Sequence, residues 1–146
     1  LSELRRLGIG KVAQEIEGDD LGGRKMKLSD YRGKVIVLTF WGTWCGPCMQ
    51  MVPDERKLVE RMAGKLFALI GINSDNDQAK LKAAVEKEKI TWPSFRDGSQ
   101  GPISKAWNVH SWPTVYVLDR KGVIRYRNVR GQALADAVDA LLLEGK

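Results

Sequence analysis

The chain has 146 residues, 43% of them hydrophobic, and carries 24 Lys and Arg against 18 Asp and Glu, a net charge of +6. A chain of this length folds as one domain and needs no disulfide framework, so its two cysteines indicate chemistry rather than cross-linking. The basic residues are scattered among acidic ones, which argues against a nucleic-acid surface. Apolar runs such as Val35 to Leu38 and Leu66 to Ile72 are far shorter than the roughly 20 residues of a membrane span.

The sequence begins at Leu1 and shows no basic stretch followed by an apolar run and a cleavage site. We therefore expect a segment of a longer polypeptide, with residues 1–7 as a flexible lead-in and any signal peptide or anchor outside the segment. No repeat, low-complexity tract or long linker interrupts the chain. The sequence predicts a single domain over residues 1–146.

The N-terminal part predicts a hairpin and then a central strand. Short alternating segments, residues 12–17 and 24–27, flank glycines in the way that is typical of a hairpin. Ser29 and Asp30 indicate a short capped turn. The near-continuous apolar run in residues 34–41 predicts a strand covered on both faces, and this strand leads into a cysteine motif.

The rest of the chain alternates helices and strands. Helical spacing begins at Cys48, Pro53 is expected to kink this helix, and residues 54–57 are expected to lie mostly outside. The following elements are a buried strand over 66–73, a helix over 78–89, two antiparallel strands over 114–118 and 123–127, and an amphipathic helix carrying Leu134, Val138, Leu141 and Leu142. This order predicts an α/β fold.

Cys45 and Cys48 lie between the central strand and the next helix, where the N–H groups and dipole of a helix N-terminus stabilise a thiolate. Their spacing in a first helical turn separates the Cα atoms by roughly 5.5 Å, a distance that a disulfide accepts. Pro47 suits the first turn because no N–H is needed there. We predict that Cys45 is the exposed, attacking sulfur and that Cys48 is shielded and resolves the intermediate.

Two alternatives for the cysteine pair are a structural zinc site and two inert core residues. Zinc favours four nitrogen or sulfur ligands, and the chain offers two cysteines and one histidine. A C-x-x-C motif at a strand-to-helix junction favours redox chemistry instead. We expect no metal, and no cofactor other than a redox-active Cys45–Cys48 disulfide.

The segment from Phe40 to Cys48, FWGTWCGPC, resembles the active site of the thioredoxin superfamily. Pro53 matches the proline within that family's active-site helix, and residues 112–114 (Trp-Pro-Thr) resemble its cis-proline loop. The hairpin and the run of residues 28–34 are similar to the TlpA/ResA-like branch of thiol-disulfide oxidoreductases. This resemblance implies a thioredoxin fold, with a central mixed β-sheet flanked by helices, an added N-terminal β-hairpin, and dithiol-disulfide exchange with protein substrates.

The resemblance also indicates where a substrate binds. A cis bond before Pro113 brings a backbone edge beside Cys45, although a trans proline at a strand start is the ordinary alternative. Trp44 and Trp112 are expected to form an apolar rim beside the sulfur, whereas Trp41 fits the core. The residues expected to support substrate binding and the active site are Trp44, Gly46, Pro47, Trp112 and Pro113.

The chain departs from these relatives where a carboxyl group is expected. Thioredoxins carry an Asp six residues before the first cysteine, where this chain has Thr39, and ResA-like proteins carry a Glu six residues after it, where this chain has Met51. Since Cys48 must lose a proton before it attacks, we predict proton transfer through water organised by Thr39, with no acid coupled to Cys48. His110 is expected to be an exposed loop residue rather than a stabiliser of the Cys45 thiolate.

The leading hypothesis is a reductant of protein disulfides that is fed by an upstream thiol donor, because the Gly-Pro pair between the cysteines resembles that of thioredoxin. One alternative is a peroxiredoxin-like thiol peroxidase, although Gly42 stands where those enzymes need Thr. Another is a redox-inert peptide-binding module. The resemblance implies an extracytoplasmic protein, periplasmic or membrane-anchored and facing outward, and we expect a monomer that binds no nucleic acid.

Overall fold

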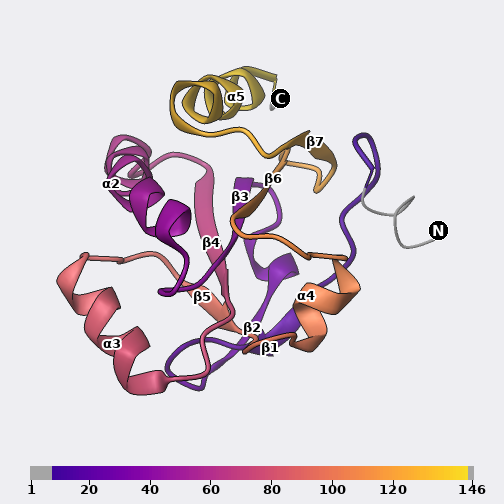
Figure 1. The fold of residues 1–146 in the computed structure, drawn as a ribbon. Coiled ribbons are helices and arrows are strands. Elements are labelled where there is room, and N and C mark those ends of the chain that lie inside the picture. The colour runs from indigo at the N-terminus through magenta and orange to yellow at the C-terminus, as the bar shows by residue number, and fades with distance from the viewer. Residues whose placement is uncertain (1–7, 145–146) are drawn as a thin grey trace.

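The computed structural model describes residues 8–144, in which helices cover both faces of a five-stranded sheet (Figure 1). The expected lead-in, residues 1–7, lies outside this described part. The strands follow the order β5 (Ser94–Arg96), β4 (Phe67–Asn73), β3 (Val35–Trp41), β6 (Thr114–Leu118) and β7 (Ile124–Arg127). The β5, β4 and β3 strands run parallel to one another, and β6 is antiparallel to β3 and β7. The sheet is therefore mixed, as expected for a thioredoxin fold.

The central strand β3 is buried along its whole length. Val35 and Val37 pack into the hydrophobic cluster on one face of the sheet, whereas Ile36 and Leu38 pack into the cluster on the other. This alternation explains why the strand is apolar at nearly every position rather than at every second one. The cysteine motif follows the end of β3 and therefore begins at the middle of the sheet.

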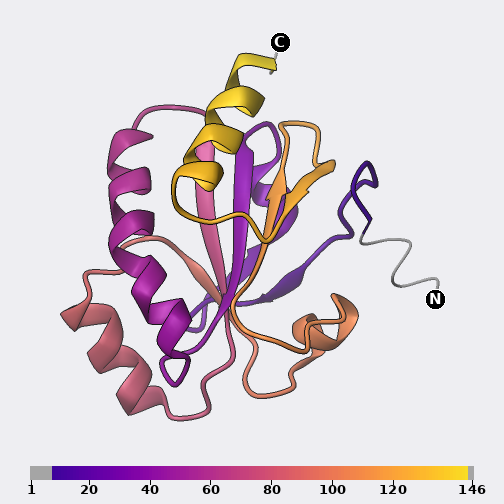
Figure 2. The ribbon, with the colours of Figure 1, turned by 45° about the horizontal axis from the view of Figure 1, so that its top comes forward.

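One face of the sheet is covered by α2 (Gly46–Arg61) and α5 (Gly131–Glu144), and α3 (Gln78–Lys87) adds Leu81 to the same cluster. Figure 2 shows α2 and α5 side by side along this face. The opposite face is covered by α4 (Pro102–Ala106) and by the N-terminal segment, which contains β1 (Glu17–Asp19), β2 (Lys25–Lys27) and the 3-10 helix η1 (Leu28–Tyr31). No helix within residues 8–144 is both long enough and apolar enough to cross a membrane.

The added N-terminal hairpin is present but shorter than expected, since β1 begins at Glu17 rather than at residue 12. Val12 instead forms a bridge with Val123 beside β7, and Asp20 forms one with Phe95 of β5. The segment before and after β1 therefore reaches both edges of the main sheet. Backbone groups in residues 10–13 bond there rather than to a hairpin partner.

Two short elements, β5 and α4, were not expected from the sequence, and two helix ends differ. The strand β5 has three residues and α4 has five, too few for a periodic signal, and pairing with β4 defines β5. The helix α2 begins at Gly46 rather than Cys48, and Pro53 lies inside it. The helix α3 ends at Lys87 rather than at residue 89.

Candidate active site

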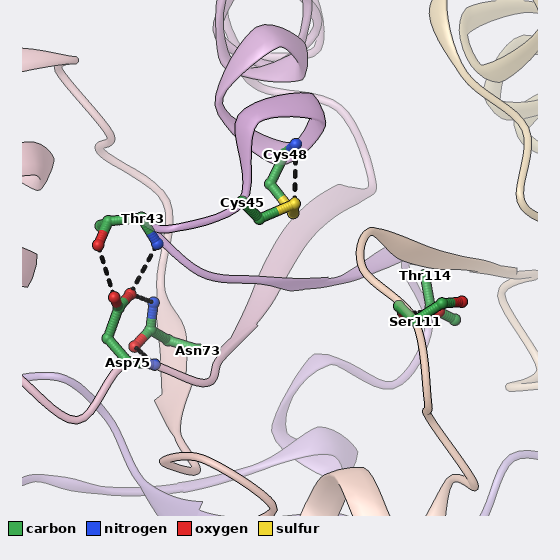
Figure 3. Close-up of a disulfide and its surroundings, with 7 residues drawn as sticks. All are labelled: Thr43, Cys45, Cys48, Asn73, Asp75, Ser111 and Thr114. Atoms are coloured by element: carbon green, nitrogen blue, oxygen red, sulfur yellow. Dashed lines mark hydrogen bonds between the residues drawn. A yellow bond between two sulfur atoms is a disulfide. The ribbon is translucent and has the colours of Figure 1, made fainter.

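Cys45 and Cys48 form a disulfide at the N-terminus of α2 (Figure 3). Cys45 is the N-cap residue with extended backbone angles, and its Sγ accepts a hydrogen bond from the Cys48 N–H at 3.2 Å. The two Cα atoms are 5.2 Å apart, which agrees with the spacing expected from the sequence. The first turn of the helix therefore both closes the disulfide and aims an N–H donor at the Cys45 sulfur.

The expectation that Cys45 is exposed is wrong for this disulfide form. Cys45 is 5% exposed and Cys48 is 2% exposed, and both belong to the hydrophobic cluster beneath α2. The bond to Cys48 and the N–H contact hold the Cys45 sulfur against the first helical turn. Trp44, directly before Cys45, is by contrast 57% exposed.

A buried carboxylate holds the loop that leads into the cysteines. Asp75 is buried, and its carboxylate accepts hydrogen bonds from the Thr43 N–H at 2.9 Å, the Thr43 hydroxyl at 2.5 Å and the Asn73 amide at 2.8 Å. Figure 3 shows this cluster on the opposite side of the motif from α2. This cluster was not expected from the sequence, although Asp75 lies two residues after the strand predicted over 66–73, at the edge where the neighbouring central strand also ends.

The peptide bond between Trp112 and Pro113 is cis, as the resemblance implied. The Thr114 hydroxyl donates to the Ser111 carbonyl at 2.7 Å and closes the loop around it. Thr114 begins β6 and lies opposite Phe40 near the end of β3. The loop thus lies at the sheet edge where the cysteine motif emerges (Figure 3).

Trp44 and Trp112 form the expected aromatic rim. Their rings meet edge to face, with centroids 5.5 Å apart and an interplanar angle of 73°. Trp41 lies in the core instead, where its indole N–H donates to the Ser94 hydroxyl at 3.0 Å. Gly42 leaves room for the rim, because a Cβ at this position would lie 2.5 Å from atoms of the Trp44 ring.

A carboxyl group lies near Cys48 at a position that the sequence did not indicate, whereas the prediction that no acid is coupled to Cys48 stays a prediction. Glu55 is 5% exposed, and it lines a cavity of about 10 Å³ together with Cys48 and Thr39. The Thr39 hydroxyl donates to the Glu55 carboxyl at 3.2 Å. Thr39 and the buried Met51 occupy the two positions at which the resemblance led us to expect an acid.

The pKa of Glu55 is raised from 4.5 to about 7, chiefly because burial disfavours the charged form. The hydrogen bond from Thr39 opposes this rise, and the nearby charge of Asp54 adds to it. Residues 54–57 were expected to lie mostly in solvent, and for Glu55 this expectation is wrong. The helical spacing of Cys48, Met51, Val52, Glu55 and Leu58, all buried, is the signal that places Glu55 inside.

A groove of about 490 Å³ runs beside the motif, between α2 and the start of α5. Pro47 lies at its cysteine end, and Met51, Arg130 and Leu134 are among its other lining residues. His110 is exposed, as expected, and its ring contacts the Asn108 side chain at 2.6 Å.

Comparison with known proteins agrees with this geometry. A model of the AhpC/TSA family matches residues 9–127. The chain belongs to the AhpC/TSA family. The thioredoxin-like protein YneN of Bacillus subtilis is 36% identical over 126 residues, which cover 83% of this chain and 72% of YneN. The thiol-disulfide oxidoreductase ResA of Bacillus cereus is 29% identical over 97% of this chain and 80% of its own length.

Solved structures of similar proteins show the same architecture. A thiol-disulfide oxidoreductase from Bacteroides fragilis superimposes with a TM-score of 0.82 at 26% identity, covering 90% of this chain and 99% of that one. A DsbF homologue from Corynebacterium diphtheriae gives a TM-score of 0.77 at 30% identity, covering 90% and 87%. Within this family, the chain is therefore a thiol-disulfide oxidoreductase of the ResA-like type, with the thioredoxin fold and an added N-terminal hairpin.

Proposed function

We propose that the protein reduces disulfides in other proteins, with Cys45 as the attacking thiolate and Cys48 as the resolving thiol. The observation that carries this assignment is the N-cap position of Cys45, whose sulfur receives the Cys48 N–H. In the reduced protein the same donor and the helix dipole stabilise negative charge on Cys45. Cys48 lies within the first turn of α2 and is the more buried of the two.

The reaction proceeds by two exchanges that balance in electrons and protons. The Cys45 thiolate attacks one sulfur of the substrate disulfide, forms a mixed disulfide and releases one substrate thiolate. Cys48 then loses its proton and attacks the Cys45 sulfur, which breaks the mixed disulfide and releases the second thiolate. The substrate gains two electrons and two protons, and the protein is left with the Cys45–Cys48 disulfide.

The substrate is held as an extended segment beside the disulfide. The cis-proline loop at Pro113 presents a backbone edge there, a common way to bind an extended chain. The rim of Trp44 and Trp112 adds an apolar surface next to it. Gly46 and Pro47 follow Cys45 in the motif, and both are exposed to solvent on this side.

A thiol donor must return two electrons to the disulfide after each turnover, and no other cofactor is required. We place this activity outside the cytoplasm, periplasmic or membrane-anchored, because one similar structure is a secreted thiol-disulfide isomerase from Corynebacterium glutamicum, with a TM-score of 0.78 at 26% identity. We propose that the domain acts as a monomer.

Trapping of the mixed disulfide tests the proposal. Reduced Cys48→Ser protein should form a stable covalent adduct with insulin through Cys45, whereas Cys45→Ser protein should form none and wild-type protein should release reduced insulin chains. Equal trapping by both variants would contradict the assigned roles. Unchanged function in the double variant would favour the redox-inert peptide-binding alternative.

A further inference from the structure

Glu55 lines two cavities whose other lining residues differ. On one side it lines the small cavity that also contains Cys48 and Thr39. On the other side it lines the groove between α2 and α5, next to Met51 and Leu134. Its carboxyl group therefore lies between the buried sulfur and a surface that is open to solvent.

Burial of this acid is not explained by stability. The hydrogen bond that the carboxyl group accepts comes from the neutral Thr39 hydroxyl. An acid removed from water without a cationic partner destabilises a fold, because neither charge nor lone pairs are fully compensated. A leucine or methionine at this point of the buried helical face would pack without that cost.

The small cavity is suited to proton transfer. Its volume of about 10 Å³ is close to the minimum that one water molecule requires. Cys48, Thr39 and Glu55 supply polar atoms, and apolar residues close the rest of its wall, namely Trp41, Val52, Ile90 and Trp92. A proton that leaves the Cys48 sulfur therefore meets Glu55 directly or across one water.

The charged groups around Glu55 are on its groove side. Asp54, Lys57 and Arg61 come from α2 itself, and Arg130 comes from the segment before α5. The elements that face Glu55 from the sheet side, β3 and the segment after α3, contribute Thr39, Trp41, Ile90 and Trp92 to the shared cavity and add no ionisable group there.

We propose that Glu55 takes up the Cys48 proton during resolution and passes it to solvent through the groove between α2 and α5, away from the face that binds the substrate. This inference rests on the proposed function. A substrate joined to Cys45 covers the rim of Trp44 and Trp112 and excludes water there. The groove between α2 and α5 then gives the proton a separate route to solvent. When a donor reduces the disulfide, Glu55 returns a proton to Cys48 by the same route.

The proton balance is complete within this route. The Cys48 S–H bond breaks, its proton goes to the Glu55 carboxylate, and the Cys48 electron pair forms the bond to the Cys45 sulfur. The released substrate thiolate takes a proton from solvent, and Glu55 later gives its proton to water in the groove. The raised pKa of Glu55, about 7, lets the group both accept and release a proton near neutral pH.

Carbon-13 NMR of the reduced protein tests the first half of the proposal. Cys48 Cβ and Glu55 Cδ should share two inflections as pH rises, since strongly interacting groups titrate as a pair. In Glu55→Gln protein the Cys48 profile should lose the inflection that it shares with Glu55 and keep those of the two thiols, and resolution of a preformed mixed disulfide at pH 7 should slow by about 100-fold. Glu60→Gln, an exposed change on the same helix, should alter neither quantity.

A Cys48 titration that is identical in wild-type and Glu55→Gln protein would overturn the proposal. This outcome is distinct from failure of the proposed function, because the titration is read without any substrate. Inability of wild-type protein to reduce insulin, with intact Cys48–Glu55 coupling, would contradict the function and leave the proton contact in place.

A larger side chain in the groove tests whether the proton of Glu55 reaches solvent there. Ala135 lines the groove and Ala133 is exposed on the same helix outside it. Ala135→Trp should move the Glu55 titration to higher pH, because it removes the water on that side, whereas Ala133→Trp should leave it unchanged. An unchanged Glu55 titration in folded Ala135→Trp protein would show that the groove is not the solvent side of Glu55.

Discussion

The carboxylate of Asp75 accepts both the backbone N–H of Thr43, at 2.9 Å, and the hydroxyl of Thr43, at 2.5 Å. Thr43 precedes Cys45 by two residues, so the end of β4 fixes the path of the chain into the active site. The Thr43–Asp75 contact thus links the position of the Cys45 sulfur to the end of β4, which is distant in sequence.

Asp75→Asn should destabilise the protein by about 1–3 kcal/mol, because an amide NH2 then faces the donors of Thr43 or Asn73 and leaves a buried group unpaired. Urea unfolding followed by tryptophan fluorescence measures this change. Glu60→Gln, an exposed carboxyl on α2, provides the control. Equal stability of the two variants would show that the contact to Thr43 contributes nothing.

Gly42→Ala should displace Trp44, since the added Cβ would lie 2.5 Å from its indole ring. The edge-to-face contact with Trp112 should be lost, and with it part of the apolar surface offered to substrates. We expect a shift in tryptophan emission and a KM for insulin raised several-fold. Gly46→Ala is the control for folding, because a Cβ there meets nothing within 4 Å. An unshifted spectrum in Gly42→Ala protein would contradict the steric argument.

The stability of the oxidised protein should fall as pH rises from 4.5 to about 7. The folded protein holds the Glu55 proton more tightly than the unfolded chain, so its contribution is complete below pH 4.5 and is lost as pH passes the raised pKa of about 7. The difference between wild-type and Glu55→Gln protein should change by about 3 kcal/mol over this range. Urea unfolding at several pH values measures it, with Glu60→Gln as control. Parallel profiles would show that Glu55 is not perturbed.

Ser94→Ala should cost about 1–3 kcal/mol, because it leaves the buried indole N–H of Trp41 without an acceptor. Trp41 ends β3 and Ser94 begins β5 on the far side of β4, so the bond joins the strand before the active site to the edge of the sheet. Thermal unfolding provides the comparison, and Ser99→Ala, at an exposed position, should be near neutral. A loss of equal size in both variants would rule out the indole contact as its cause.

The strands at the centre of the sheet could be predicted from sequence because burial on both faces leaves its mark at every position, as in β3. The three-residue spacing of Cys45 and Cys48 was likewise enough to predict a Cα distance that allows a disulfide. The cis bond between Trp112 and Pro113 was identified through the resemblance. By contrast, β5 and α4 are held by pairing and packing with distant elements. These elements are too short to show a hydrophobic periodicity in the sequence.

The two acids of the site were missed for different reasons. Glu55 stands in a charged run, where the composition of residues 54–57 suggested a solvated face, although its helical phase places it beneath α2. Asp75 follows a strand by two residues, and its partner Thr43 is remote in sequence. Only the parallel register of β3 and β4 brings them together.

The most direct test of the central claim is the reduction potential of the Cys45–Cys48 couple. The purified protein would be equilibrated in defined thiol-disulfide buffers, followed by Trp44 fluorescence and checked by thiol trapping. A reductant of protein disulfides should give a value near that of thioredoxin, about −270 mV. A value near about −120 mV, typical of a strong disulfide-forming oxidant, would contradict the proposed direction of electron flow.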